Sequence, residues 1–196
     1  MRPGKNLMNS AVEDRVVCIT GASGSILGIR LLKQLGKKST HLVISDSAKI
    51  VIAQETGYSV SDVEQMAEHV YSDKDIAARI SSGSFRFSSA VIIPCSTSTL
   101  SRISSGIADS LITRVASVSI KERRKLILVP RETPLSTITL ENMVRLSKSG
   151  VIIAPYMPAF YTKPKSVDDM VDFMVSRVLD LMEINNELIR RWDGPE

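Results

Sequence analysis

The chain has 196 residues, of which 43% are hydrophobic and 23% are charged, and its formal net charge is +4. This balance and length suit one globular α/β domain. Aromatic residues make up only 5% of the chain and are not interleaved with basic ones, so no nucleic-acid-binding face built on base stacking is expected.

The first half of the chain alternates short apolar runs with amphipathic ones. Residues 1–14 are polar and predict a flexible N-terminal tail. Strands are predicted at 15–20, 41–45 and 90–94, where β-branched and apolar residues run without interruption. Helices are predicted at 26–35, at 46–57 with Gly57 after its end, and at 61–70 with Ser61 as its cap and Glu64 completing a capping box. Residues 81–89 form a serine-rich loop before the third strand.

The second half continues the same alternation. A helix is predicted to begin near Leu100, followed by helices at 109–124, 139–148 and 166–191, with strands at 125–129 and 151–154. Strands separated by helices imply parallel pairing through right-handed crossovers. We therefore expect a single Rossmann-like (flavodoxin-like), doubly wound parallel sheet with helices on both faces over residues 15–192, and a short tail at 193–196.

Both cysteines, Cys18 and Cys95, fall in apolar strand-like runs. Buried free thiols are expected, which indicates a reducing, cytoplasmic compartment. The isolated His41 and His69 have no ligand spacing with the cysteines, so no metal site is predicted. The sequence has no run of about 18 apolar residues that would predict a membrane span.

Ligands of such a sheet bind beyond the carboxyl ends of its strands. The first strand is followed by a glycine-rich turn, 20–25, whose backbone N–H groups could approach an anion. The turn lacks the G-x-G-x-x-G spacing, and Gly28 falls one residue late for a related pattern, which weakens a dinucleotide interpretation. We favour ligand contact over a plain tight turn.

Two more strand ends carry polar residues. Ser45 and Asp46 follow the second strand, where an acid could bind a ribose hydroxyl or cap a helix, and we favour the cap for Asp46. Four consecutive hydroxyl residues, 96–99, follow Cys95. Capping needs only one hydroxyl, so the surplus favours binding of a phosphate or a polar ring.

The strand at 125–129 ends in Arg131 and Glu132, a cation beside a potential proton carrier. The alternative is a surface ion pair in a turn. Of the basic residues before this strand, Arg123 and Arg124 are interpreted as solvated cations that complement a helix dipole. Arg114 and Lys121, seven residues apart, share one helical face.

Two side chains near the C-terminus have two open interpretations each. Tyr161 lies in a proline-rich loop, where its phenol could bond an anion or pack on a ring. Arg177 stands among apolar neighbours and is either a cation whose head reaches water or an inward anion ligand.

Taken in order, these segments resemble the UbiX-type flavin prenyltransferases. No single motif is decisive, and the resemblance rests on the ordered set between residues 15 and 192. The matching segments are 20–24, 42–48, 80–85, 94–101, 121–124, 129–135, 158–161 and 191–192.

The resemblance implies a homo-oligomer, typically a dodecamer, with sites at subunit interfaces. Such an enzyme transfers a dimethylallyl group from dimethylallyl phosphate to N5 and C6 of reduced FMN without a metal ion. The product, prenylated FMN, serves a separate UbiD-type decarboxylase.

The resemblance also implies roles for individual residues. Glu132 matches the acid/base residue, Arg131 contacts flavin and phosphate, and Ser23 lies near N5. The implied FMN contacts are Gly21, Ala22, Ser23, Ser45, Ser96, Thr97, Ser98, Thr99 and Arg131. The implied pocket for the prenyl phosphate is formed by Arg114, Lys121, Tyr161, Arg177 and Ser82, and some of these residues reach across from a neighbouring subunit. Leu27, where many members have tyrosine, and Ser98, in place of a common glycine or lysine, depart from the family pattern.

Two rival functions remain alternatives. Flavin-dependent decarboxylases of cysteine-tailed substrates share the fold but carry a Pro-Ala-Ser-Ala-Asn-Thr motif and use a histidine base. Here the corresponding stretch, 94–99, has a different sequence, and His41 lies inside a predicted strand. Both features count against this class. A non-catalytic FMN-binding accessory subunit would need the same ring and phosphate contacts, so only turnover separates it from an enzyme.

Overall fold

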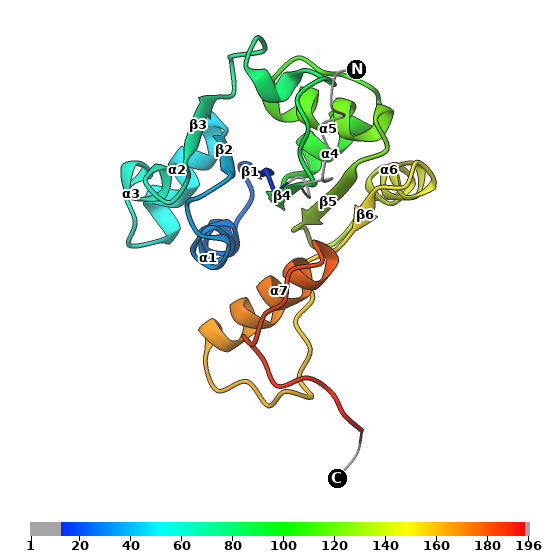
Figure 1. Cartoon of the computed structure of the whole chain (residues 1–196). Coiled ribbons are helices and arrows are strands. Elements are labelled where there is room, and N and C mark those ends of the chain that lie inside the picture. Colours follow the sequence, from blue (N-terminus) through cyan, green and yellow to red (C-terminus); the bar gives the residue numbers. More distant parts are fainter. Residues whose placement is uncertain (1–12, 195–196) are drawn as a thin grey trace, which may run out of the picture.

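The computed structural model describes residues 13–194, shown in Figure 1. Six parallel strands form one sheet in the order β3-β2-β1-β4-β5-β6. The strands are β1 (Arg15–Ile19), β2 (Thr40–Ile44), β3 (His69–Ser72), β4 (Ser89–Cys95), β5 (Lys125–Pro130) and β6 (Ile152–Ile153). The predicted doubly wound parallel sheet is confirmed, and the strand order reverses between β1 and β4, where such sheets bind ligands.

Helices cover both faces of the sheet (Figure 1). One face carries α1 (Ser25–Leu35), α2 (Asp46–Glu55), α3 (Val60–Glu64) and α7 (Val167–Leu181). The other carries α4 (Thr97–Ser104), α5 (Leu111–Lys121), α6 (Thr137–Lys148) and the short 3₁₀ turn η1 (Arg79–Ser81). None of the described helices is long and apolar enough to cross a membrane.

The central strands consist of uninterrupted apolar residues because both faces of the sheet are buried. In β1, Val17 and Ile19 pack into the cluster under α1 and α7, whereas Val16 and Cys18 pack into the cluster under α4 and α5. Both sheet faces are therefore dry. The prediction of buried free thiols is confirmed for Cys18 and Cys95, and burial raises the pKa of Cys95 to about 12.

The predicted helix at 61–70 is too long, because α3 ends at Glu64 and the last two residues of the range already belong to the edge strand β3. The helical part is short, and Ser59 caps it in a capping box with Asp62 rather than Ser61 with Glu64. Among the described strands β3 pairs with β2 alone, and its residues alternate between half-buried and exposed. Without β3, the five predicted strands have the flavodoxin-like order 2-1-3-4-5, and the added edge gives the usual Rossmann order.

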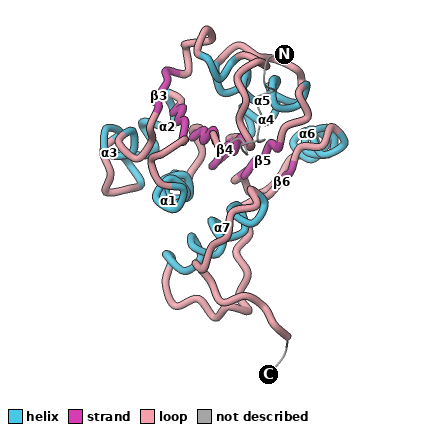
Figure 2. Tube along the Cα trace, in the orientation of Figure 1, coloured by secondary structure: helices cyan, strands magenta, loops and turns pink. Residues whose placement is uncertain are grey.

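Several helices also begin or end at residues other than those predicted. The C-terminal helix was expected to reach 191 but ends at Leu181, and Figure 2 shows the segment that follows as loop. Glu183 has a φ of 62°, which breaks the helix there. The helix expected near Leu100 begins earlier, at Thr97, because Ser96 caps it. The helix expected over 109–124 is confined to α5, since Ser110 caps its start and Arg123 adopts a φ of 54° beyond its end.

The close packing of α1 on β4 depends on Gly28. A Cβ at this position would lie 2.6 Å from the carbonyl oxygen of Ile93 and 3.0 Å from Ile19 Cδ1. We expect Gly28→Ala to destabilise the fold by about 1–3 kcal/mol, and each kcal/mol to lower the melting temperature by roughly 2–4 °C. Thermal denaturation checks this, with Gly57→Ala as the control because nothing lies within 4 Å of a Cβ there. Equal melting temperatures for the two variants would contradict the packing argument.

Candidate active site

A cavity of about 420 Å³ opens at the carboxyl edge of the sheet, where strands β1, β2 and β4 end. The structure brings together there the glycine-rich turn and the two hydroxyl-bearing strand ends that the sequence predicted. The lining consists of Gly21, Ser45, Asp46, Ser47, Asp73, Ser96, Thr97, Ser98, Thr99, Arg102, Ser110, Ile112 and Thr113.

The turn after β1 needs glycine for close approach. A Cβ at Gly21 would come within 2.5 Å of Ser47 Cβ, so only glycine lets this backbone lie against the first turn of α2. Ala22 is buried beside it and Ser23 is exposed. No side chain among residues 13–194 caps α1, so its first N–H groups are available to an anion.

The hydroxyls divide into those that cap helices and those that remain available. Ser45 accepts a hydrogen bond from the Ala48 amide (3.1 Å), and Ser96 accepts one from the Thr99 amide (3.2 Å). The side chains of Thr97 and Ser98 make no hydrogen bond within residues 13–194. This stretch therefore has more hydroxyl groups than helix capping requires, and the two available ones, on Thr97 and Ser98, belong to residues that line the cavity.

The expectation that Asp46 caps α2 is wrong. Ser45 is the N-cap, and Asp46 is the first helical residue. Its exposed carboxylate pairs with Lys74 (2.9 Å), and the hydrogen bond with Lys74 lowers the pKa of Asp46. Serine takes the cap because its short hydroxyl reaches the amide three residues on, which leaves the acid free for a cation from the loop after β3.

Arg131 and Glu132 follow β5 at the same edge. They form no ion pair with each other or with any other described residue, which removes the surface ion pair as an explanation. The Arg131 side chain is half-buried, and its Nε is fully buried with no hydrogen-bond partner in the described chain. A buried, unpaired N–H of a charged group is costly, so it marks a place where an acceptor is expected. The exposed Glu132 carboxylate accepts the Thr133 amide at 2.9 Å, which orients it.

Glu55 belongs to this region and was missed by the sequence analysis. Its carboxylate accepts the amide of Gly24 at 2.8 Å, so it holds the turn that carries Ser23. Gly24 itself has a φ of 94°. The helix dipole disfavours an acid in the last turn of a helix, so the position of Glu55 at the end of α2 was the feature of the sequence that could have indicated a special role. Asp73, also missed, binds the amides of Leu111 and Ile112 at the start of α5.

Lys121 and Ser82 lie at the opposite, amino edge of the sheet. Lys121 ends α5, four residues before β5 begins, and its ammonium pairs with Glu122 at 2.7 Å. The hydrogen bond with Lys121 lowers the pKa of Glu122. The Ser82 hydroxyl lies 2.8 Å from that of Ser84 in the same loop. The six-residue strand β5, about 20 Å long, separates Lys121 from Glu132.

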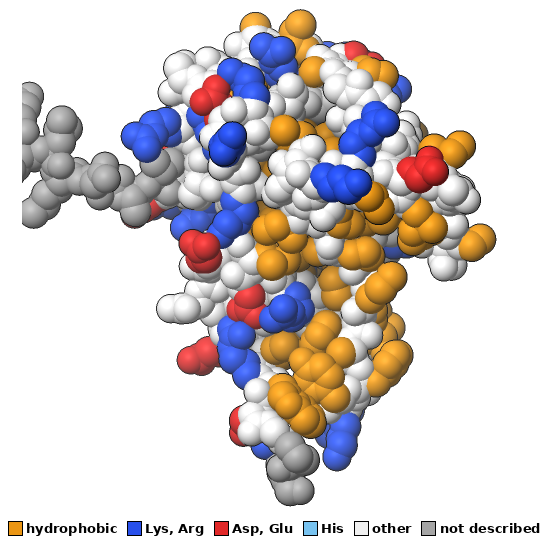
Figure 3. All heavy atoms as spheres, turned by 90° about the vertical axis from the view of Figure 1, so that its right-hand side faces the viewer, with side chains coloured by type: hydrophobic (Ala, Val, Ile, Leu, Met, Phe, Trp, Pro, Cys, Tyr) orange, Lys and Arg blue, Asp and Glu red, His pale blue; other side chains and the backbone are white. Residues whose placement is uncertain are grey.

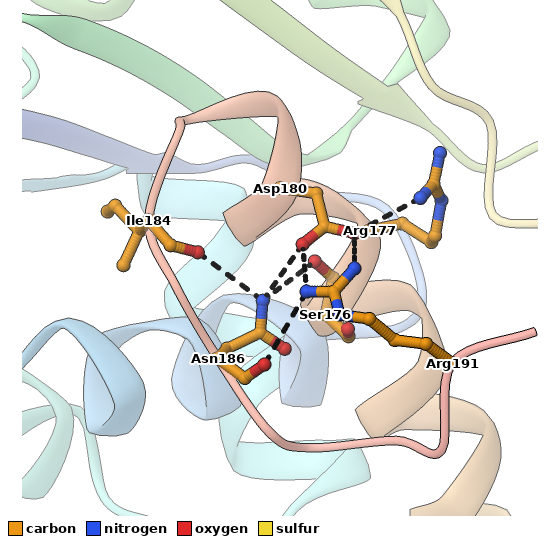
Figure 4. A network of polar contacts seen from close by, with 6 residues as sticks. All are labelled: Ser176, Arg177, Asp180, Ile184, Asn186 and Arg191. Carbon is orange, nitrogen blue, oxygen red and sulfur yellow. Dashed lines mark hydrogen bonds and ion pairs between the residues drawn. The ribbon is translucent and has the colours of Figure 1, made fainter.

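Tyr161, Arg177 and Arg114 are exposed at the surface of the chain. Tyr161 packs edge-on against Phe173 and Trp192, with ring centroids 5.9 and 5.5 Å away. Arg177 pairs with Asp180 at 3.1 Å and is 53% exposed, so its head reaches water. Figure 4 shows Asp180 as the centre of this network, with Arg177, Arg191 and Asn186 around it. The hydrogen bond with Arg191 lowers the pKa of Asp180.

Figure 3, seen from the side of α6, shows many hydrophobic side chains at the surface of the molecule. They come from α6, from the loop after β6, from the start of α7 and from the C-terminal segment. The exposed large apolar residues of these segments are Ile138, Leu140, Val144, Met157, Phe160, Tyr161, Val167 and Trp192. Exposed apolar surface of this extent is typical of a protein–protein interface.

Comparisons with known proteins agree with this geometry. The sequence matches the Flavoprotein family over residues 5–179. It is 58% identical to a flavin prenyltransferase UbiX of Thermoplasma acidophilum over 177 residues, which cover 90% of this chain and 98% of that protein. A probable UbiX-like flavin prenyltransferase of Bacillus subtilis is 51% identical over 92% of this chain and 90% of its own.

Solved structures show the same relationship. AnUbiX, solved in complex with FMN and dimethylallyl pyrophosphate, superposes with a TM-score of 0.91 at 45% identity, over 94% of this chain and all of that one. A dodecameric FMN-dependent Ubix-like decarboxylase of Escherichia coli O157:H7 gives 0.90 at 50% identity, over 92% of this chain and all of that one. The peptidyl-cysteine decarboxylase EpiD, at 18% identity and a TM-score of 0.62, shares the fold alone. The chain belongs to the UbiX-type flavin prenyltransferases.

Proposed function

We propose that this chain joins a dimethylallyl group from a prenyl phosphate to N5 and C6 of reduced FMN, without a metal ion. The observation that carries this proposal is the unpaired, buried Nε of Arg131 beside the oriented carboxylate of Glu132, at the edge where the hydroxyl-lined cavity opens. The identities of the flavin and of the prenyl donor are inferred from the related flavin prenyltransferases.

The cavity suits the phosphate and the ribityl chain of FMN. Thr97 and Ser98 present hydroxyls, and the start of α1, which no described side chain caps, presents N–H groups, all of which favour phosphate oxygens. Arg131 would donate its buried N–H to a flavin or phosphate oxygen. Reduced FMN supplies the nucleophilic N5 and C6 atoms, and the protein supplies binding and orientation.

Loss of an allylic phosphate builds negative charge on its oxygens. Fixed cations stabilise that charge, and Arg114, Lys121, Arg131 and Arg177 would do so in place of a divalent ion. Tyr161 adds a neutral donor. Glu132 would accept a proton or pass one to the departing phosphate. Exclusion of water keeps the allyl fragment from hydrolysis.

These groups cannot all reach one substrate within one subunit. Lys121 and Ser82 lie at the amino edge of the sheet, whereas Arg131 and Glu132 lie at the carboxyl edge. A neighbouring copy must therefore contribute one of the two groups. The exposed apolar surface supports such assembly, and we propose a homo-oligomer, a dodecamer like the related Escherichia coli protein, with active sites between subunits. We further propose that the enzyme is cytoplasmic and passes its product to a UbiD-type decarboxylase.

Anaerobic turnover tests the proposal. The protein is incubated with reduced FMN, a metal chelator, and either dimethylallyl phosphate or dimethylallyl pyrophosphate, and the flavin is analysed by mass spectrometry. We expect a five-carbon gain with at least one donor. Flavin that binds but keeps its mass with both donors would contradict the proposal and favour an accessory FMN-binding subunit.

Arg177 provides a test of the pocket for the prenyl phosphate. We expect Arg177→Ala to raise KM for the prenyl phosphate by about 10-fold or more, the size of a lost charge-assisted hydrogen bond. FMN affinity should not change, because Arg177 lies outside the cavity at the carboxyl edge. Steady-state kinetics check this, with Lys148→Ala, an exposed cation on α6, as the control. An unchanged KM would show that Arg177 serves only Asp180.

A further inference from the structure

Arg124 is not the solvated cation that its sequence position predicts. Its Nη1 donates to the carbonyl oxygen of Phe85 at 2.7 Å, and its Nη2 donates to that of Gly83 at 2.5 Å. The guanidinium carbon lies 4.4 Å from the ring centre of Phe87. The side chain is half-buried, and burial lowers the pKa of Arg124. The adjacent Arg123 is exposed, so the helix-dipole interpretation fits only that residue.

The two carbonyls belong to the loop 82–87, which contains Ser82. This loop follows η1 and precedes β4, and within residues 13–194 it makes no hydrogen bond with a strand of the sheet. Within it, the Phe85 amide donates to the Ser82 carbonyl at 3.2 Å. The guanidinium of Arg124 therefore supplies the loop's bonds to the body of the domain on this side.

A second group of side chains holds the loop from its other side. The Phe85 ring packs edge-on against His41, with centroids 5.3 Å apart, and Arg79 lies 4.9 Å from the same ring. Arg79 donates to the Tyr71 hydroxyl at 2.9 Å, and His41 Nδ1 lies 3.0 Å from that oxygen. The loop is thus fixed between β2, β3 and η1 on one side and the end of α5 on the other.

The loop lies directly against Lys121. A Cβ at Gly83 would come within 2.9 Å of Lys121 Nζ and would overlap Glu122 Oε1. Glycine at this position lets the backbone touch the ammonium group, with the exposed Ser82 beside it. Because the loop position depends on Arg124, so does the placement of the Ser82 hydroxyl relative to the Lys121 ammonium.

We infer that Arg124 is a positioning residue for the prenyl-phosphate site, which fixes the loop 82–87 so that Ser82 and Lys121 bind the phosphate together. This inference rests on the proposed function, since it assigns the pair to the donor's phosphate. In this inference, Arg124 acts through its hydrogen bonds to the two carbonyls. A guanidinium fits this role because its planar fork satisfies two acceptors at once, which lysine cannot do.

The test compares Arg124→Gln with Arg123→Gln in the full assembly. The two variants remove the same charge one residue apart, and only the first breaks the bonds to the loop. We expect Arg124→Gln to raise KM for dimethylallyl phosphate about 10-fold, with FMN affinity unchanged. Arg124→Lys should recover part of the loss, and Arg123→Gln should behave as the unmodified protein. Hydrogen exchange should become faster at the amides of 82–87 in Arg124→Gln but not at those of β1 and α1.

The outcomes separate this inference from the proposed function. Normal turnover with unchanged KM and unchanged loop exchange in Arg124→Gln would overturn the inference alone. An equal loss of FMN affinity would also overturn it, since that would reveal a general structural role.

If the unmodified protein makes no prenylated flavin, the proposed function fails, and inorganic phosphate then serves as the probe. Phosphate should slow exchange at 82–87 in the unmodified protein and not in Arg124→Gln, and equal slowing in both would overturn the inference. Should Arg124→Gln fail to fold, Arg124→Lys carries the same comparison.

Discussion

Replacing Glu132 with glutamine is expected to lower the rate of prenyl transfer by about 10²–10⁴-fold, the usual size of a general acid/base contribution, while FMN still binds. The carboxylate follows β5 beside Arg131, is exposed to an incoming substrate, and is oriented by the Thr133 amide. Glutamine keeps the shape and the acceptor oxygen for that amide but cannot exchange a proton at neutral pH. The loss should therefore appear in kcat rather than in FMN affinity.

Single-turnover kinetics with reduced FMN measure this effect directly. Glu141→Gln is the matched control, because Glu141 is an exposed glutamate on α6 outside the cavity. We expect the control to turn over at the rate of the unmodified protein. Undiminished transfer by Glu132→Gln would remove this residue from the chemistry.

Arg131→Gln is expected to weaken FMN binding by about 10- to 150-fold, which corresponds to a charge-assisted hydrogen bond of about 1.5–3 kcal/mol. The reason is the buried Nε, which finds no acceptor among residues 13–194. The same observation predicts the behaviour of the flavin-free protein. Since an unpaired buried N–H destabilises the fold, its removal should not lower the melting temperature when FMN is absent.

Flavin titration and thermal denaturation with and without FMN check both parts. The rise in melting temperature on adding FMN should shrink in Arg131→Gln and remain in Arg123→Gln. Unchanged FMN affinity would contradict the assignment of Arg131 as a flavin ligand. A lower melting temperature without FMN would contradict the argument from the unpaired Nε, because it would show that Arg131 stabilises the flavin-free fold.

The carboxyl-edge site could be predicted because parallel strands place their ends side by side. Gly21, Ser45 and the hydroxyls at 96–99 each follow a strand in the sequence, and they line one cavity in the structure. The separation of Lys121 from Glu132 was equally accessible, since one residue precedes β5 and the other follows it. Strand direction alone places them at opposite edges.

Other features depend on contacts that a sequence pattern does not encode. β3 is a half-exposed edge strand, so it lacks the apolar run of a buried strand. It also follows a helix that ends sooner than its capping residues suggest. Arg124 and Arg123 are adjacent cations after the same helix, and only the fold decides that one of them meets two carbonyls. Glu55 binds a backbone amide from a turn thirty-one residues earlier in the chain, so its partner is visible only in three dimensions.

Subunit complementation tests the central claim that each active site joins the carboxyl edge of one subunit to the amino edge of another. Glu132→Gln and Lys121→Ala are each expected to be inactive alone, and they are co-expressed in equal amounts with different affinity tags so that hybrids can be purified. Random mixing in a symmetric oligomer leaves about a quarter of the sites with both residues intact, and we predict turnover near that fraction of the unmodified enzyme. Hybrids no more active than either parent would show that Glu132 and Lys121 act from the same subunit, which would contradict the account.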